Sequence, residues 1–531
     1  MLLVKCYVSL CFTFNKNNMG ILSNLYDYQK EVVESTLNSN KGIIVLPTGT
    51  GKTYCQAAII ANDILNNQNS FRMYVVNAPR ILLTYQLLKE VYSVLVSSGI
   101  DARYHLVHSG TAVDESEMEE VRVLSNLEGA NINFSEINAT TSVGKTYEVI
   151  EKAKSQNLPI IIFSTYNSAE NVEIARAMIN QPISIILNDE AHYLVQERFF
   201  DILNTLYGER CYFFTATTKH TPSDTGRGMN NIESYGPILY YLSPREAIDK
   251  GKMVKPRIQL VKSDGYHVTE DFDRSLSLFI LNSYQQHKTH FDENHNGLNP
   301  KILISARGSN DIKLFINSVE YSNLRTLGVD IFAISSVDEI GNDINGRKVK
   351  RQEFLKTLKE YGANPNKKMI VIHFDILTEG IDVPGFTSCM PLRALNKGRF
   401  VQTFGRCSRL DLKDKDRMNS GEISPNDLDK MFKPFAYIIL PLITNTNQDD
   451  SEYIRQIITE LRDYGFSPHE DIVGDVDIRG ISESDNIDGL NEIIKKEKTT
   501  GDLIDEIHSE FELEEIAKLS PLEYLRTHLN K

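Results

Sequence analysis

Short apolar runs alternate with longer segments of helical periodicity along most of this chain. In the first half, six apolar runs have the length of strands, and each is followed by a polar turn or a helical pattern. These runs are Ile43–Leu46, Tyr74–Ala78, Tyr104–His108, Ile160–Ser164, Ile183–Asn188 and Cys211–Thr215. Continuous apolar strands separated by helices are typical of doubly wound parallel sheets. The pattern therefore predicts an α/β domain over residues 19–236.

A second set of strand-like runs follows in the same rhythm. Its members are Ile258–Val261, Ile302–Ser305, Ile331–Ile334, Met369–Phe374, Ser388–Pro391 and Tyr437–Leu440. They predict a second α/β domain over residues 255–444, joined to the first by a linker of residues 237–254. The predicted fold class is thus α/β, with two doubly wound parallel-sheet domains in tandem.

The two ends of the chain lack this alternation. Residues 1–18 form an extension whose apolar run is interrupted by Lys5 and is too short to span a bilayer. It has neither the basic start nor the small-residue cleavage site of a secretory signal, so we expect no secretion and no membrane partner. Met19 is an alternative start of translation. Residues 445–531 are predicted to form an acidic, mainly helical C-terminal segment.

Length and cysteine usage narrow the class of protein. The 531 residues suit two or three domains. The six cysteines form no C-x-x-C pair, so neither a zinc site nor a disulfide framework is expected. We therefore expect a reducing compartment, which is the cytoplasm, or the host cytoplasm or virion if the chain is viral.

The net charge of −14 is concentrated at the C-terminal end. From Asn445 onward, 22 acidic residues face 9 Lys and Arg, a balance of −13, so the preceding chain is close to neutral. An acidic segment repels nucleic acid and is not expected to contact it. It could bind a basic protein partner, act as a brake on a basic cleft of its own chain, or simply aid solubility.

A glycine-rich turn directly follows the apolar run that ends at Val45. Gly49 and Gly51 let the backbone curl so that successive N–H groups point at phosphate oxygens. Lys52 can reach the β- and γ-phosphates of ATP, and Thr53 can hold Mg²⁺. The predicted loop comprises Pro47, Thr48, Gly49, Thr50, Gly51, Lys52 and Thr53. It departs from the strict pattern at Leu46, where glycine is expected. A second G-K-T, at Gly144 to Thr146, has no strand before it and predicts a helix start.

A carboxylate pair ends a later apolar strand, at Asp189-Glu190. Behind a phosphate-binding loop, Asp189 would hold Mg²⁺ and Glu190 would orient and deprotonate the attacking water. The alternative is a solvated acidic turn after a strand.

Two arginines, Arg406 and Arg409, follow the loop by some 350 residues. Phosphoryl transfer needs positive charge on the γ-phosphate, and an arginine finger is worth about 10³–10⁵ in rate in related enzymes. Three residues apart, the two arginines would share one face of a helix. A second domain must carry them to the loop, which makes domain closure the expected switch for hydrolysis. The alternative is a pair of solvated surface arginines.

Further motifs follow the same order along residues 25–410. They are Tyr28-Gln29, Ala78-Pro79-Arg80, Ser164-Thr165-Tyr166, Asp189-Glu190-Ala191-His192, Thr215-Ala216-Thr217, Thr378 to Pro384, and Gln402 to Arg409. In these motifs the chain resembles the superfamily-two helicases and translocases, specifically the DEAH-type branch near the restriction-enzyme helicase subunits and the phage or viral helicases.

The resemblance implies two RecA-like domains that use ATP and Mg²⁺. It implies a catalytic set of Lys52, Asp189, Glu190, Gln402, Arg406 and Arg409, with Thr53 and Asp189 at the metal. It implies further nucleotide contacts from Tyr28, Gln29, Gly380 and Asp382, where the Gln29 amide would read the adenine edge. It implies nucleic-acid contacts from Pro79, Arg80, Ser164, Thr165, Tyr166, Arg307 and Thr378. It implies coupling through His192, Thr215, Ala216 and Thr217.

We therefore expect an ATP-dependent helicase or translocase that acts on DNA or RNA. The choice between the two nucleic acids stays open, because such motors contact mainly phosphates. One alternative is a non-motor scaffold subunit that keeps the helicase fold. Another is a motor subunit of a restriction, defence or viral transcription complex that acts with partners.

Overall fold

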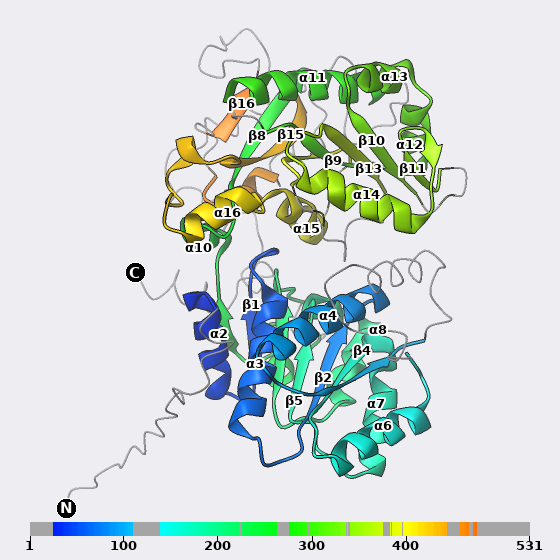
Figure 1. Cartoon of the computed structure of the whole chain (residues 1–531), viewed down its shortest axis with the longest axis vertical. Helices are drawn as coiled ribbons and strands as arrows, with labels where there is room; N and C mark the ends of the chain where they lie inside the picture. Colours follow the sequence, from blue (N-terminus) through cyan, green and yellow to red (C-terminus); the bar gives the residue numbers. More distant parts are fainter. Residues whose placement is uncertain are drawn as a thin grey trace, which may run out of the picture.

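The computed structural model describes a chain built on two β-sheets, each covered by helices (Figure 1). The described residues are 25–109, 139–221, 226–262, 276–294, 298–335, 337, 340–374, 383, 385–393, 395, 397–442, 457–462, 464–466 and 471–474. We call the part built on the seven-stranded sheet the first domain and the part built on the nine-stranded sheet the second domain. No helix among the described residues is both long and apolar enough to cross a membrane.

The first sheet has the strand order β3-β4-β2-β5-β6-β1-β7, and every neighbouring pair is parallel. Its strands are β1 (Lys41–Val45), β2 (Met73–Ala78), β3 (Arg103–Val107), β4 (Ile160–Thr165), β5 (Ile185–Asn188), β6 (Cys211–Thr215) and β7 (Ile238–Tyr241). The first six coincide with the six predicted runs to within two residues. The seventh was not predicted, because Ile238–Tyr241 falls in the segment assigned to the linker.

Helices cover both faces of this sheet. They are α2 (Asp27–Leu37), α3 (Lys52–Asn66), α4 (Ile81–Ser97), α6 (Val143–Ser155), α7 (Ala169–Met178), α8 (Glu197–Phe200) and α9 (Ile232–Tyr235). On one face Tyr74 and Val76 of β2 join the core formed with α3 and α4. On the other, Met73 and Val75 join the core formed with α6 and α7. Because both faces are buried, the strand is continuously apolar and does not alternate.

The second sheet has the order β12-β11-β10-β13-β9-β14-β15-β8-β16. Its strands are β8 (Lys255–Lys262), β9 (Lys301–Ser305), β10 (Asp330–Ile334), β11 (Asn342–Ile344), β12 (Arg347–Lys348), β13 (Met369–His373), β14 (Ser388–Pro391), β15 (Phe435–Leu442) and β16 (Ile472–Gly474). All neighbouring pairs are parallel except β10–β11 and the β11–β12 hairpin, which are antiparallel. The hairpin turns through Asn345 and Gly346, both at positive φ, which is the turn chemistry that two-residue hairpins require.

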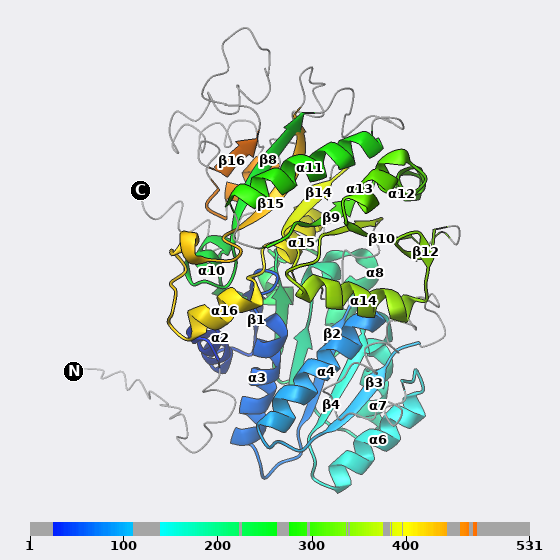
Figure 2. The same ribbon diagram turned by 45° about the horizontal axis from the view of Figure 1, so that its top comes forward.

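The helices of the second half complete this domain. They are α10 (Pro244–Asp249), α11 (Leu276–Asn294), α12 (Ser309–Ile316), α13 (Val319–Thr326), α14 (Arg351–Ala363), α15 (Lys397–Cys407) and α16 (Leu412–Asn419). In both views α14 and α15 lie on the side of the second domain that faces the first (Figures 1 and 2).

Part of the predicted C-terminal appendage belongs to the second domain. Strand β16 pairs in parallel with β8, at the edge of the nine-stranded sheet. Next to it the carboxylate of Asp471, 2% exposed, lies 2.7 Å from the ammonium of Lys255. Within the predicted C-terminal segment, residues 457–462 are helical, whereas residues 472–474 form a strand of the second sheet.

The residues just before β16 pack against helix α15. Leu461, Tyr464 and Phe466 are buried in the same core as Phe404 of α15. The rings of Tyr464 and Phe404 meet edge to face, with centroids 5.3 Å apart. This C-terminal brace, which we define as residues 457–462 and 464–466, therefore supports the helix that precedes Arg409.

Replacing Leu461 by alanine tests this brace. The side chain is fully buried, so Leu461→Ala should lower the free energy of unfolding by about 2–5 kcal/mol. Leu412, 58% exposed, provides the control, since Leu412→Ala should change it by less than about 0.5 kcal/mol. Urea unfolding followed by circular dichroism compares the two. If the two variants had the same free energy of unfolding, the C-terminal brace would not stabilise the second domain.

Candidate active site

The glycine-rich turn connects β1 to α3, as predicted. Gly49 and Gly51 adopt φ of +87° and +84°, and Gly51 forms the N-cap of α3. These left-handed conformations suit glycine, and the first N–H groups of α3, which have no partner within the helix, can bind an anion. Leu46, which replaces the expected first glycine, is fully buried, and its N–H donates to the carbonyl of Thr215 at 3.0 Å. That position extends β1 and fills the core.

The carboxylate pair lies at the same edge of the sheet, beyond the end of β5. The side chain of Asp189 accepts a hydrogen bond from the amide of Gln56 on α3 at 2.7 Å. The ammonium of Lys52 lies 3.2 Å from the Glu190 carboxylate. Glu190 has φ of +47°, a strained conformation for a residue other than glycine and one that is frequent at active sites. The structure thus joins Lys52, Asp189 and Glu190 into one cluster.

The pKa values of the two carboxylates in this cluster are shifted in opposite directions. Burial, together with the neighbouring Glu190 carboxylate, raises the pKa of Asp189. Burial also acts to raise the pKa of Glu190, but the charge of Lys52 and the side chain of His192 outweigh it and lower that pKa. One ammonium therefore cannot compensate both carboxylates, and an additional cation would favour the ionised form of Asp189.

The donor set fits Mg²⁺. Thr53 and Asp189 offer hard oxygen ligands, which Mg²⁺ prefers. Within the described residues no group of three or more His, Cys, Asp or Glu could hold a metal ion by itself. A few protein oxygens completed by phosphate and water are the usual surroundings of Mg²⁺ in phosphoryl-transfer sites.

Three of the four residues expected to act in coupling, namely His192, Thr215 and Thr217, form a chain of contacts that starts at Glu190. His192 Nδ1 lies 3.3 Å from the Glu190 carboxylate and 3.2 Å from the hydroxyl of Thr215, at the end of β6. That hydroxyl in turn donates to the carbonyl of Thr217 at 2.7 Å. Glu190 is therefore connected to the Thr215-Ala216-Thr217 turn through one imidazole.

The second domain meets the phosphate-binding loop through the end of α15. A Cβ placed on Gly405 would lie 2.8 Å from Cβ of Thr48. A Cβ placed on Gly49 would lie 3.3 Å from Cγ of Arg409. The structure thus brings Arg409 beside the loop, and Gln402 lies half-buried one turn before Gly405.

The expectation that Arg406 and Arg409 share one helix face is wrong. Helix α15 ends at Cys407, so Arg409 lies in the turn beyond it. Arg406 is 8% exposed, and its charge acts on His373 at the end of β13. Burial, reinforced by Arg406 and then Arg393, lowers the pKa of His373 to about 3.

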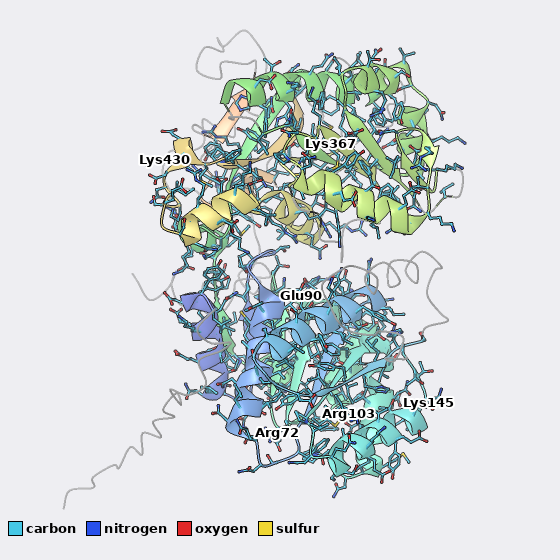
Figure 3. All side chains as sticks on the ribbon, in the orientation of Figure 1. Arg72, Glu90, Arg103, Lys145, Lys367 and Lys430 are labelled. Carbon is cyan, nitrogen blue, oxygen red and sulfur yellow. The ribbon has the colours of Figure 1, made fainter. Side chains whose placement is uncertain are left out.

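Glu90 of α4 joins the site without any signal in the sequence. Figure 3 shows it at the end of the first domain that faces the second, whereas Arg72 lies at the opposite end. Although the residue is exposed, the protein atoms around the Glu90 carboxylate partly desolvate it and raise its pKa. A hydrogen bond with Thr53 and the charge of Arg409 act to lower it. A single Glu in an amphipathic helix could not be distinguished from a solvated surface residue.

The residues expected to read adenine hold the loop in this structure. The Gln29 amide is 4% exposed, accepts from the N–H of Tyr26 at 3.1 Å and lies 3.4 Å from the carbonyl of Thr50. The hydroxyl of Tyr28 donates to the same carbonyl. Both side chains therefore link the start of α2 to the phosphate-binding loop, and a contact with adenine stays a prediction.

Those of the described residues that were expected to contact nucleic acid divide into three groups. Pro79 and Arg80 are half-buried beyond the end of β2. Ser164, Thr165 and Tyr166 are buried at the end of β4. The hydroxyl of Tyr166 donates to the carbonyl of Asp189 at 2.6 Å. Arg307 is held by the carboxylate of Asp311, with its Nη2 at 2.9 Å. Thr378, Gly380 and Asp382 lie outside the described residues.

Comparison with known proteins agrees with this architecture. Residues 22–220 match the family described as Type III restriction enzyme, res subunit. A search of curated proteins finds no match. Among solved structures, the chain is similar to the ATP-dependent Type ISP restriction-modification enzyme LlaBIII bound to DNA, with 17% identity, a TM-score of 0.59, and 83% of this chain and 30% of that chain covered. It is also similar to a nuclease-deletion mutant of the Type ISP restriction-modification enzyme LlaGI in complex with a DNA substrate mimic. The identity is 18%, the TM-score is 0.52, and the match covers 83% of this chain and 29% of that chain.

At these identities the structural similarity shows the fold alone, which is that of two tandem RecA-like domains. Over residues 22–220, the family match confirms the predicted resemblance to the restriction-enzyme helicase subunits. The chain spans about 30% of the length of the two restriction enzymes.

The contact between Gly405 and Thr48 yields a prediction. Gly405→Ala would place a methyl group 2.8 Å from Thr48 and displace α15 from the loop. We expect ATP hydrolysis to fall about 10²-fold, as for a 1 Å misplacement, while ATP affinity changes little. Steady-state ATPase and equilibrium binding assays separate the two effects.

The control is Gly144→Ala, at the second G-K-T. Helix α6 begins there at Val143, with Ser142 as its N-cap, which confirms the predicted helix start. A Cβ at Gly144 would meet only Ser142 Oγ, at 3.8 Å. If Gly405→Ala hydrolysed ATP as fast as Gly144→Ala, α15 would not act at the loop.

Proposed function

We propose that this chain is a DEAH-type ATP hydrolase that couples hydrolysis between its two RecA-like domains to movement on nucleic acid. One observation carries the proposal, namely that Arg409 of the second domain lies beside Gly49 of the first. The hydrolytic site is then complete only when both domains contribute. Closure of the domains becomes the step that permits hydrolysis.

In this proposal the residues act in sequence. Lys52 and the N-terminus of α3 bind the phosphates of ATP. The ion pair between Lys52 and Glu190 must loosen as phosphate arrives, which leaves Glu190 able to orient and deprotonate the attacking water. Mg²⁺ held by Thr53 and Asp189 would neutralise charge on the phosphates. Arg409 stabilises the negative charge that develops on the transferred group.

The proposed track for nucleic acid includes Pro79 and Arg80, at the edge of the sheet that also carries the loop. We favour DNA, because the two similar enzymes with TM-scores above 0.5 are described with DNA or a DNA mimic. The proposal extends to the motor activity alone, since the chain corresponds to less than a third of those enzymes. A protein partner at the acidic C-terminal segment remains part of the proposal.

Two substitutions test the hydrolytic assignment. Lys52→Ala removes the phosphate ligand, so ATP binding and turnover should both be lost. Glu190→Gln keeps a similar shape but removes the base, so ATP binding should persist while turnover falls about 10²–10⁴-fold. Filter binding and phosphate-release assays measure the two quantities. Loss of ATP binding in Glu190→Gln to the same extent as in Lys52→Ala would make Glu190 structural.

Stimulation by nucleic acid distinguishes a motor from a scaffold that keeps the fold. We expect DNA to raise ATP turnover, and Arg80→Ala to raise the DNA concentration that gives half of this stimulation. Assays with single- and double-stranded DNA and RNA, at low and high salt, provide the comparison. Turnover that no nucleic acid changes would support the scaffold alternative.

A further inference from the structure

Three successive main-chain carbonyls, from Cys407 to Arg409, are each held by a donor from another segment. The buried ammonium of Lys433 donates to the carbonyl of Cys407 and to that of Arg409, both at 2.6 Å. Between them, the carbonyl of Ser408 accepts from the N–H of Val254 at 2.8 Å. The main chain on both sides of the Arg409 side chain is therefore fixed by hydrogen bonds.

These three hydrogen bonds, which we call the clamp, lie at the C-terminal end of a helix. Helix α15 ends at Cys407, and the last carbonyls of a helix have no partner within it. The C-terminal end of a helix also carries partial negative charge, which favours a nearby cation. Lys433 supplies both the donor and the charge at this point.

The position of Lys433 is itself fixed. Its side chain is 2% exposed, and the fully buried carboxylate of Asp414 accepts from the N–H groups of Phe432 and Lys433, each at 2.8 Å. Asp414 belongs to α16, the helix that follows the turn. The turn, α16 and the segment before β15 thus form a closed circuit of hydrogen bonds. Burial of a charge is costly unless the charge is compensated by hydrogen bonds, as it is here.

The side chain that this circuit orients reaches the other domain. The aliphatic part of Arg409 lies within 3.3 Å of a Cβ placed on Gly49, and its Nε within 3.5 Å. An arginine has many rotamers, so its guanidinium is placed accurately only if its main chain is held still. A small shift of the turn would move the guanidinium relative to the phosphate-binding loop.

We propose that Lys433 is a positioning residue that fixes the arginine finger Arg409 by clamping the main chain of its turn. The inference rests on the proposed function of Arg409 in ATP hydrolysis. Lys433 lies at the turn and acts on the reaction through Arg409 alone. Its removal should therefore slow hydrolysis without weakening the binding of ATP.

Lys433→Met tests this, since methionine fills a similar volume without a donor. We expect kcat to fall about 10²-fold, the usual cost of a misplaced group, and ATP affinity to stay within about threefold. Lys433→Gln keeps an N–H donor on a shorter side chain, so its kcat should lie between those of the wild type and of Lys433→Met. An unchanged kcat in Lys433→Met, or a loss of ATP affinity that accounts for the whole effect, would overturn the proposal.

Lys301 provides a matched control. It is a second buried lysine of the same domain, 1% exposed, whose ammonium donates to the carbonyl of Gly362. Lys301→Met should lower thermal stability as Lys433→Met does and leave kcat unchanged. An equal fall of kcat in both variants would assign the effect of Lys433 to general stability.

A double-mutant cycle separates positioning from folding. In an Arg409→Ala background Lys433→Met should cause no further loss of kcat, because the group that it positions is gone. A further loss of about 10²-fold would overturn the inference while leaving the proposed function intact. Absence of ATP hydrolysis by the wild-type chain, with ATP bound, would instead overturn the proposed function itself.

Discussion

The structure depends on one electrostatic constraint, the burial of two adjacent carboxylates beside a single ammonium. Asp189 and Glu190 end one strand, and Lys52 begins the helix after another, so parallel strands bring them to one edge. Addition of a triphosphate increases the negative charge at this edge. Among the described residues, Lys52 and the start of α3 offer positive charge at this edge from the first domain. In the proposed mechanism a metal ion and Arg409 of the second domain supply more, so that both sheets contribute to one site.

The architecture around α15 follows from that requirement. Gly405 removes the side chain that would hold α15 away from Thr48, and the turn after the helix places Arg409 beside Gly49. The C-terminal brace also packs against this helix, through the contact of Tyr464 with Phe404. Contacts to the helix therefore extend from the end of the described chain to the phosphate-binding loop. Two discrete positions of α15 relative to the loop would suffice to turn hydrolysis on and off.

Local chemistry made much of this predictable from the sequence. Buried parallel strands are continuous apolar runs, so twelve strands and the Lys52, Asp189 and Glu190 cluster could be placed before the structure was known. The β11–β12 hairpin was missed, although Asn345-Gly346 is a strong turn signal. Strands β7 and β16 are short and pair with distant residues, and no local pattern distinguishes them from a linker or an acidic tail. Glu90 and Lys433 depend on contacts between segments far apart in the chain, which periodicity cannot predict.

The central claim is that hydrolysis requires Arg409 from the second domain at a nucleotide held by the first. Single-turnover hydrolysis by Arg409→Ala, with ATP already bound, measures this most directly. We expect the rate to fall about 10³-fold or more, with ATP affinity nearly unchanged and with little recovery in Arg409→Lys, which lacks the planar guanidinium. Hydrolysis of bound ATP by Arg409→Ala at the wild-type rate would contradict it.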